Sequence, residues 1–491
     1  MKNAGFSATI IGKQPHDTMS DYKPTIGLEV HAELATRTKM FCDSLNDPSE
    51  LHPNVNVCPV CMGHPGTLPV PNKQAIEYVL KVGLATGGTP NERSRFDRKN
   101  YFYPDLPKAY QISQSGQPLV LGGMLRDIKI NHIHLEEDAG KLMHDDAGGG
   151  TLVDYNRASV PLMELVTEPD IRSAEDAVAF MKELQLVLRY LGVSDADLER
   201  GQMRADANIS ISSDPAMLGT RAEVKNLNSF NSVFQAINYE IKRQTEILDK
   251  GETVHQETRG WDDAKQKSVS QRSKEEAQDY RYFPEPDIPP FETAVFDIEA
   301  LRDSIPELPA QKRVRFAHEY GLDERAADAL AGELAAANYF EEAVSEFREE
   351  IPDGSITTVY NYLSSDLRGL MNQAAVSFAD LKVGPDHLAS LAVLIDQKKI
   401  TSRQAKDMLA KMFETGADPK EIMQSENIGI SNTDEVEAVV LAVIAEHYAA
   451  VADYKKGKVA SLQFLIGQAM AKLKGRARPD MLKEIFEKNL A

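Results

Sequence analysis

The sequence predicts an α+β protein, in which an antiparallel-sheet cradle domain is followed by an all-helical domain and a small helical tail domain. Residues 21 to 309 are rich in two-residue alternation, Gly, Pro and aromatic side chains, which is typical of strands and their turns. Later segments such as residues 324–347 are rich in Ala, Leu and Glu at helical spacing. Pro306 and Pro309 separate the two regions, because they disfavour a continuous helix.

Length and charge limit the domain count and the function. The chain has 491 residues, which at about 100 to 200 residues per domain indicates roughly three domains. We expect a flexible extension (1–20), a catalytic cradle (21–304), a helical domain (305–420) and a helical tail (421–491). The net charge of −20 excludes a basic nucleic-acid binder as a whole, but it permits a local basic patch.

Cysteine content and hydropathy indicate the compartment. Three Cys in so long a chain cannot form a disulfide framework, and an odd count favours a reducing compartment, so we expect a cytoplasmic protein. No uncharged apolar run approaches the ~20 residues that span a bilayer, so no membrane partner is expected.

Sequence signals for helix starts and ends predict two helices in the cradle. Ser173 and Asp176 resemble a capping box, and the apolar stripe that follows ends at Gly192. A second stripe runs from about Ser229 to Gly251. Both stripes are typical of helices that pack on a core.

Acidic residues alternate along the first predicted strand. In residues 26–34 the even positions are apolar, whereas Glu29, His31 and Glu33 occupy odd positions. Period two places these three on one face, with same-face residues about 6.6 to 6.8 Å apart. Carboxylates with one imidazole suit Mg²⁺ or Mn²⁺. The alternative is the solvated face of a one-sided sheet.

Further acids stand at residues 136–138 and 164. A strand would split Glu137 from Glu136 and Asp138 across its two faces. Glu164 lies in an apolar run, where an ionised carboxylate needs either a metal or a buried ion pair.

A predicted hairpin adds polar groups. Residues 203–211 place Arg204, Asp206 and Asn208 on one face, and residues 221–226 return with Glu223 and Lys225 on one face. The sequence has no glycine-rich phosphate loop. Any phosphate would therefore be bound by a metal and scattered cations.

Aromatic and basic residues interleave at 98–105 and 279–287. Flat rings beside cations suit a nucleotide or a splayed RNA end. The alternative is a set of core aromatics at a Pro-rich corner.

The cysteines form a knuckle, in which Cys42 precedes Cys58-x-x-Cys61. This pattern resembles a structural zinc site that lacks one thiolate, and His52 or His64 could supply the fourth ligand. Partly buried thiols without a metal are the alternative.

The tail carries a run of cations without an acid between residues 455 and 478. Such a local reversal of sign is the footprint of an RNA-contacting patch, and a solvated basic face is the alternative. The cations are Lys455, Lys456, Lys458, Lys472, Lys474, Arg476 and Arg478.

Seven segments in order resemble the B subunit of the aspartyl/glutamyl-tRNA amidotransferase, over nearly the whole chain after Ser20. They are residues 26–31 (IGLEVH), 96–105 (FDRKNYFYPD), 136–141 (EEDAGK), 168–173 (EPDIRS), 206–210 (DANIS), 225–230 (KNLNSF) and 280–287 (YRYFPEPD). The chain is similar to the bacterial or organellar type, because it lacks the large inserted domain of the archaeal relative.

The resemblance implies an RNA-dependent amide ligase. In that family, tRNA(Gln) or tRNA(Asn) mischarged with Glu or Asp is bound by the B subunit, which uses ATP to phosphorylate the side-chain carboxylate. Ammonia from a separate amidase subunit then displaces the phosphate, and a small third subunit completes the complex. Which amino acid is amidated does not follow from the sequence.

The resemblance also implies site residues. Expected catalytic residues and magnesium ligands are Glu29, His31, Glu137 and Glu164, with Asp206 and Glu223 as further ligands. We expect the ATP to be bound by Arg98, Lys99, Tyr101, Lys141, Arg204, Asn208 and Lys225. Zinc-bearing members have C-x-C before C-x-x-C, and Ser44 replaces one of these cysteines.

Two other function classes compete with this hypothesis. A noncatalytic tRNA-binding scaffold would not need acids such as Glu29, Glu137 and Glu164 where it handles RNA. A stand-alone metal-dependent hydrolase would leave the basic tail unexplained.

Overall fold

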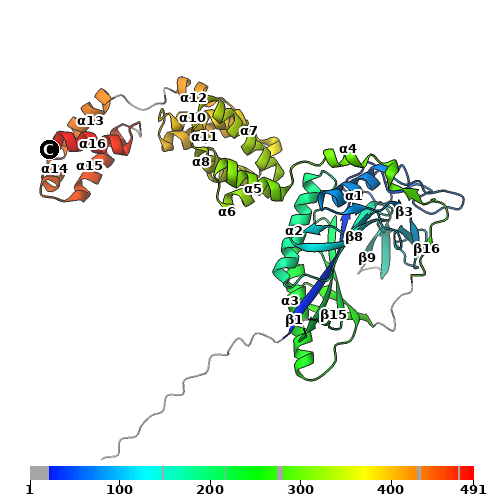
Figure 1. Ribbon diagram of the computed structural model, residues 1–491. Helices are drawn as coiled ribbons and strands as arrows, with labels where there is room; N and C mark the ends of the chain where they lie inside the picture. Colours follow the sequence, from blue (N-terminus) through cyan, green and yellow to red (C-terminus); the bar gives the residue numbers. More distant parts are fainter. Residues whose placement is uncertain are drawn as a thin grey trace, which may run out of the picture. The chain divides into compact units, whose positions relative to one another are not determined.

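The computed structural model describes residues 22–145, 149–214, 216–273, 280–426, 428, 433–473 and 476–490 (Figure 1). The chain divides into two compact units, Met1–Pro309 and Ala310–Ala491. This division falls close to the boundary expected at residue 304. The extension expected at residues 1–20 lies outside the described residues.

The first unit is built on a ten-stranded sheet with the order β15-β14-β13-β12-β1-β11-β8-β6-β2, in which β7 also pairs with β8. Its strands are β1 (Lys23–Glu33), β2 (Thr89–Pro90), β6 (Val120–Leu121), β7 (Met124–Leu125), β8 (Ile128–Glu137), β11 (Pro161–Thr167), β12 (Met203–Ser212), β13 (Ala222–Leu227), β14 (Glu257–Asp262) and β15 (Lys267–Ser273).

The pairing confirms the predicted α+β cradle and corrects one detail. Among the described strands all pairs of this sheet are antiparallel except β13 and β14, which are parallel. The reason is that helix α3 (Phe230–Asp249) lies between these two strands in the chain, and a helical crossover returns the chain in the same direction.

Three smaller sheets complete the first unit. β4 (Asp97–Asn100) lies between β5 (Tyr110–Ser113) and β16 (Phe283–Pro284). The other two are pairs, β9 (Lys141–Asp145) with β10 (Gly150–Asp154) and β3 (Arg93–Ser94) with β17 (Phe291–Glu292). The β4 sheet thus joins the two segments in which aromatic and basic residues interleave.

Helices cover one face of the large sheet. α1 (Lys73–Ala85), α2 (Ala174–Tyr190) and α3 pack with the even residues of β1 in one core, and Figure 1 shows α2 and α3 along one side of the sheet. The predicted helix starts are confirmed, since the Ser173 and Ser229 side chains accept N–H bonds at the caps of α2 and α3. Gly192 and Gly251 follow with positive φ.

The predicted hairpin is confirmed as β12 and β13. Its connection passes very close to its own strand, because a Cβ on Gly219 would lie 2.0 Å from the carbonyl oxygen of Ile211. Only glycine allows this approach. The hairpin thereby brings Glu223 beside Asn208 in register.

The second unit is helical and has two separate cores. The first unit ends with a short 3₁₀ turn (Thr293–Val295) and α4 (Ile298–Asp303). One core of the second unit is formed by α5 (Pro309–Tyr320), α6 (Glu324–Ala331), α7 (Leu334–Glu350), α8 (Ile356–Asn361), a π-helical turn (Tyr362–Leu367), α9 (Arg368–Ala374), a 3₁₀ turn (Phe378–Asp380), α10 (Pro385–Asp396), α11 (Ser402–Thr415) and α12 (Pro419–Ser425).

The other core belongs to the tail. It is formed by α13 (Thr433–Glu446), α14 (Tyr448–Lys455), α15 (Val459–Lys472) and α16 (Pro479–Leu490). None of the helices in the described ranges combines the length and the apolar character needed to cross a membrane.

We expect Phe340→Ala to destabilise the second unit alone. The Phe340 ring is fully buried and contacts the rings of Phe316 and Tyr320, so its loss should lower the free energy of unfolding by about 3 to 5 kcal/mol. Urea unfolding followed by far-UV circular dichroism measures this loss. Fluorescence of Trp261, the single tryptophan, reports the first unit and should keep its midpoint.

Glu346→Ala, at an exposed position of the same helix, is the matched control and should change the stability by no more than about 0.5 kcal/mol. A shift of the Trp261 transition in Phe340→Ala equal to the circular dichroism shift would show that the two units unfold as one.

Candidate functional site

The face of the large sheet opposite the helices is polar. Even residues of β1 are buried in the core, so alternation turns Glu29, His31 and Glu33 to the other face. The register of the neighbouring strands adds Glu164 beside His31 and Asp206 beside Glu29. Carboxylates that are far apart in the sequence therefore meet on one surface.

One cluster on this face, the histidine group, consists of His31, Glu136 and Glu164. His31 Nε2 lies 3.2 Å from Glu164 Oε2 and 3.5 Å from Glu136 Oε1. His134 Nε2 also lies 3.2 Å from Glu164 Oε2, and Lys99 Nζ lies 3.8 Å from Glu136 Oε2. Ligand atoms of the three group members all lie within 4.8 Å of one another.

Charge rather than burial decides the ionisation of the histidine group. Burial alone lowers the pKa of His31, but the carboxylates of Glu164 and Glu136 outweigh it and raise that pKa to about 10. Burial likewise raises the pKa of Glu164, and the two imidazoles reverse the shift and hold it well below the usual range. An ionised carboxylate is thus stable here only beside a cation.

A second cluster, the carboxylate group, consists of Glu29, Asp206 and Glu223, whose oxygens also lie within 4.8 Å of one another. Asn208 Nδ2 donates to Glu29 Oε1 at 2.9 Å. Lys225 Nζ lies 2.7 Å from Asp206 Oδ2 and 2.9 Å from Glu223 Oε1. One lysine therefore serves two of the three acids.

Glu29 has no cation of its own among the described residues. Burial raises its pKa, and the nearby carboxylates of Glu164, Glu223 and Asp206 raise it further. The face thus concentrates more negative charge than its fixed cations balance, which favours the binding of an additional cation.

Magnesium, which the family resemblance implies, fits this donor set. Four buried polar atoms on the face lack a hydrogen-bond partner among the described residues, namely His31 Nδ1, His134 Nδ1, Glu136 Oε2 and Asn208 Oδ1. Leaving such an atom unpaired costs about 1 to 3 kcal/mol, so a bound group that pairs with these atoms would stabilise the face. Carboxylate oxygens are the ligands that Mg²⁺ prefers.

Glu137, one of the expected catalytic residues and magnesium ligands, does not join the histidine group. Alternation along β8 turns Glu137 away from Glu136. Its carboxylate lies 2.5 Å from Lys108 Nζ and accepts a bond from the Ile112 backbone N–H. Glu136, which had not been assigned a role, takes the place expected for Glu137.

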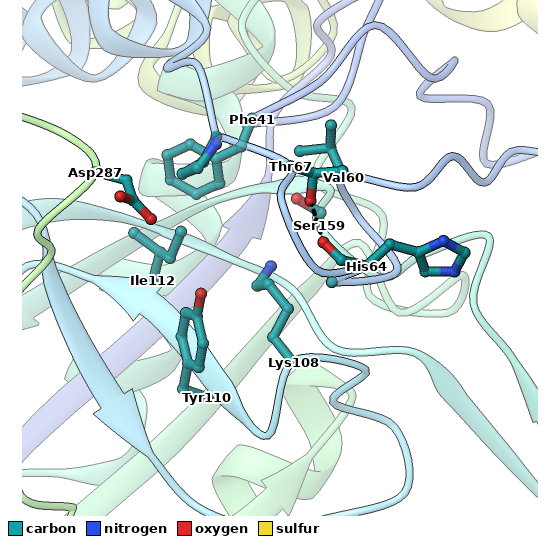
Figure 2. A pocket seen from close by; sticks show the side chains of 11 residues that line it. Phe41, Val60, His64, Thr67, Lys108, Tyr110, Ile112, Ser159 and Asp287 are labelled. Atoms are coloured by element: carbon teal, nitrogen blue, oxygen red, sulfur yellow. Dashed lines mark hydrogen bonds between the residues drawn. The ribbon is translucent and has the colours of Figure 1, made fainter.

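Lys108, the partner of Glu137, lines a small cavity of about 110 Å³. Figure 2 shows the Lys108 side chain extending toward Ser159, and its ammonium lies 5.8 Å from the centre of the Tyr110 ring. The Ser159 hydroxyl is buried without a hydrogen-bond partner among the described residues. This polar cavity is separate from both clusters of acids.

The structure brings some of the expected ATP-binding residues to the face. Lys99 contacts Glu136, and its ammonium lies 5.3 Å from the centre of the Tyr280 ring. The Tyr101 ring packs on Tyr280. Asn208 and Lys225 belong to the carboxylate group, as described above. Lys99 and the tyrosines thus combine a cation with flat rings next to the acids.

Two other expected residues, Arg98 and Lys141, lie elsewhere. Arg98 makes a bidentate contact with Glu285, at 2.6 and 2.8 Å, and thereby ties β4 to the segment after β16. Arg204 stays on the polar face, opposite His31 in register, and lies 3.1 Å from Asp138. Lys141 is exposed at the start of β9. Arg98 and Lys141 are therefore not gathered into either cluster of acids.

The three cysteines form a third cluster, with sulfur atoms within 4.8 Å of one another. The buried Lys39 ammonium and the Ser44 hydroxyl each lie 4.0 Å from Cys61 Sγ. No described histidine joins the cluster, and His52 contacts Glu50 instead. The cluster offers three of the four ligands of a structural zinc site, so zinc binding stays a prediction.

The basic tail is partly neutralised by its own fold. Four of its cations form ion pairs within the tail, Lys458 with Asp453, Lys472 with Glu446, Arg476 with Glu435, and Arg478 with Asp480. In the described part of the tail, Lys455 and Lys456 are exposed at the end of α14 and have no recorded ion pair. Lys474 lies outside the described residues.

Comparison with known proteins decides the family. Residues 24–297 match the GatB/GatE catalytic domain, and residues 338–490 match the GatB domain. The chain is 46% identical over 484 residues to the B subunit of the aspartyl/glutamyl-tRNA(Asn/Gln) amidotransferase of Caldicellulosiruptor saccharolyticus, covering 96% of this chain and 99% of that one. The chain belongs to the family of amidotransferase B subunits.

Other B subunits of this amidotransferase agree. Those of Dehalococcoides mccartyi and Brevibacillus brevis are 45% and 43% identical over 489 and 485 residues, and each comparison covers 96% of this chain and 99% of the relative. Both acid clusters lie within the matched catalytic domain, and the exposed lysines of α14 lie within the matched GatB domain. The family resemblance of the sequence motifs is thereby confirmed.

We expect the neighbouring substitutions Glu136→Gln and Glu137→Gln to differ in metal binding. Glu136→Gln removes a carboxylate of the histidine group and should weaken Mn²⁺ binding at least about 10-fold. Glu137→Gln breaks only the pair with Lys108 and should leave the Mn²⁺ affinity unchanged. Titration of the full-length chain with Mn²⁺, followed by electron paramagnetic resonance of the free ion, measures both. Equal losses in the two variants would contradict the placement of Glu136.

Proposed function

We propose that this member of the family uses ATP to activate the side-chain carboxylate of mischarged Glu-tRNA(Gln), Asp-tRNA(Asn) or both, and amidates it with ammonia from a partner amidase. The observation that carries the proposal is the polar face of the large sheet. It holds two clusters of acids, a histidine and several cations, and four of its buried polar atoms lack hydrogen-bond partners among the described residues.

The proposed chemistry has two steps. The substrate carboxylate oxygen attacks the γ-phosphorus of ATP, which forms an acyl phosphate and releases ADP. Ammonia then attacks the acyl carbon, and the carbon–oxygen bond to phosphate breaks. Both steps concentrate negative charge, so the site has to offset charge and position its reactants.

Magnesium, when bound, would offset charge on the phosphates. The groups that would hold it are the carboxylates of Glu29, Glu136, Glu164, Asp206 and Glu223, joined by His31 in its neutral form, because a metal-ligating imidazole has to be deprotonated. The protein's own part is to orient these ligands, as Asn208 does for Glu29, and to supply cations to the phosphates. Lys99 and Lys225 are suited to this role, because each is already held at the edge of an acid cluster.

The nucleotide base finds a platform beside Lys99. The Tyr101, Tyr280 and Tyr282 rings form a chain of edge contacts, with centroids 5.7 and 6.1 Å apart. Flat rings next to a cation suit stacking of a base. We therefore assign the adenine or the terminal nucleotide of the tRNA to this side of the face.

The ammonia has to come from another chain. The sequence has no G-x-S-x-G elbow, and its three cysteines all lie in the knuckle, so it shows no activated nucleophile for glutamine hydrolysis. An amidase subunit and a small third subunit are the proposed partners, with glutamine as the amide donor.

We expect His31→Ala to abolish ATP-dependent amidation of the mischarged tRNA by the assembled complex. His31 contacts both acids of its group, so its loss should remove several kcal/mol of charge stabilisation, or more than about 100-fold in rate. Conversion of Glu-tRNA(Gln) to Gln-tRNA(Gln) measures the rate, and the affinity for tRNA should change little.

His318→Ala, at an exposed position in α5, is the control for this assay and should keep full activity. Activity of His31→Ala within threefold of the unmodified complex would favour a noncatalytic tRNA-binding scaffold.

The tail is the proposed contact for the tRNA body. Lys455→Glu and Lys456→Glu together reverse the two cations that lack an ion pair in the described tail. This double change should weaken tRNA binding and lower the salt slope by about one for each lysine. Filter binding at several salt concentrations measures both. Lys458→Glu, which changes a lysine already paired with Asp453, should have a smaller effect. Unchanged affinity and slope in the double variant would exclude this surface.

A further inference from the structure

Thr258 lies behind the carboxylate group, on the side away from Asp206. Its hydroxyl donates a hydrogen bond to Glu223 Oε2 at 2.9 Å. The other oxygen of the same carboxylate, Oε1, lies 2.9 Å from Lys225 Nζ. The Glu223 carboxylate is therefore held at both oxygens, by one neutral donor and one cation.

The strand that carries Thr258 is placed by the single parallel pairing of the large sheet. β14 lies parallel to β13, with Thr258 opposite Glu223. On its other side β14 pairs with β15, and the register shifts between Thr258 and Arg259. The uninterrupted parallel register with β13 places Thr258 beside Glu223 on the same face of the sheet.

A buried ion network fixes β14 from the opposite face. Glu240 of α3 is fully buried and lies 2.6 Å from Arg243 and 3.7 Å from Arg259. Arg259 lies 2.6 Å from Glu257 and donates to the Ser268 hydroxyl and carbonyl oxygens. Removing one partner of such a buried network leaves a charge without compensation and is strongly destabilising. The residues on either side of Thr258 are thus firmly anchored.

We propose that Thr258 is a positioning residue for Glu223, and that the hydroxyl orients this carboxylate for a divalent cation shared with Glu29 and Asp206. The inference rests on the proposed function, because the divalent cation that it places at the carboxylate group is the one required by the proposed ATP chemistry. Thr258 itself does not contact the substrate in this proposal. Polar neighbours that orient metal ligands in this way are typical of metal sites.

The test uses the full-length chain, with Mn²⁺ as the probe. Thr258→Val removes the hydroxyl at nearly constant volume and keeps a residue that favours strands. It should weaken Mn²⁺ binding about 10-fold or more. Thr258→Ser keeps the hydroxyl and should restore the affinity. Thr245→Val is the matched control, because the Thr245 hydroxyl bonds only a carbonyl of its own helix.

The assembled complex gives a second readout. Thr258→Val should raise the Mg²⁺ concentration for half-maximal amidation about 10-fold, while kcat at saturating Mg²⁺ recovers. If Thr258 had a purely structural role, Thr258→Val would lower the thermal stability but would not raise the Mg²⁺ requirement while leaving kcat at saturating Mg²⁺ unchanged. Wild-type Mn²⁺ affinity in Thr258→Val would overturn the inference and leave the proposed function standing. Absence of Mn²⁺ binding to the unmodified chain would overturn both.

Discussion

The two faces of strand β1 lie in different environments, one in the hydrophobic core and one on the polar surface of the sheet. The arrangement of the first unit depends on which residues of β1 lie on each face. Its even residues are buried against helices, and its odd residues carry the acids and the histidine of the site. Because the side-chain period of a strand is two, a slip of one residue would bury Glu29 and His31 and expose Ile26 and Leu28. The hydrophobic effect that docks the helices therefore also sets the register that assembles the site.

Concentrated acids on a sheet face carry a cost that the fold offsets locally. Lys99 forms an ion pair in the histidine group, and Lys225 forms one in the carboxylate group. Arg204 and Arg157 both pair with Asp138. Among the described residues, the Asn208 amide is the partner of Glu29, and no cation pairs with it. A face that is only partly neutralised binds an added cation more readily than one in which every acid is paired. The unpaired acid on this face is thus the feature that the proposed cation would compensate.

Local patterns in the sequence predicted the elements, and long-range pairing decided which residues meet. Alternation located β1 and the β12–β13 hairpin, and caps located α2 and α3. Glu136 was missed, although His132, His134 and Glu136 share one parity along β8, which separates them from Glu137. The contact of His31 with Glu164 depends on the pairing of β1 with β11, and no local pattern specifies that pairing. The parallel β13–β14 pair arose from the crossover through α3.

The charges of the tail also show that a linear sequence pattern does not reveal which residues pair in the folded chain. The seven cations between residues 455 and 478 predict a strongly basic surface. In the folded tail, however, four of them form ion pairs with acids that lie before or after this run in the sequence. An ion pair contributes little to the field at a distance, so a phosphate backbone meets the cations that remain unpaired. In the described tail these are the two lysines at the end of α14. Of the seven cations that the linear pattern counts, the described tail therefore leaves two without an ion pair, which is the number the proposed tRNA contact rests on.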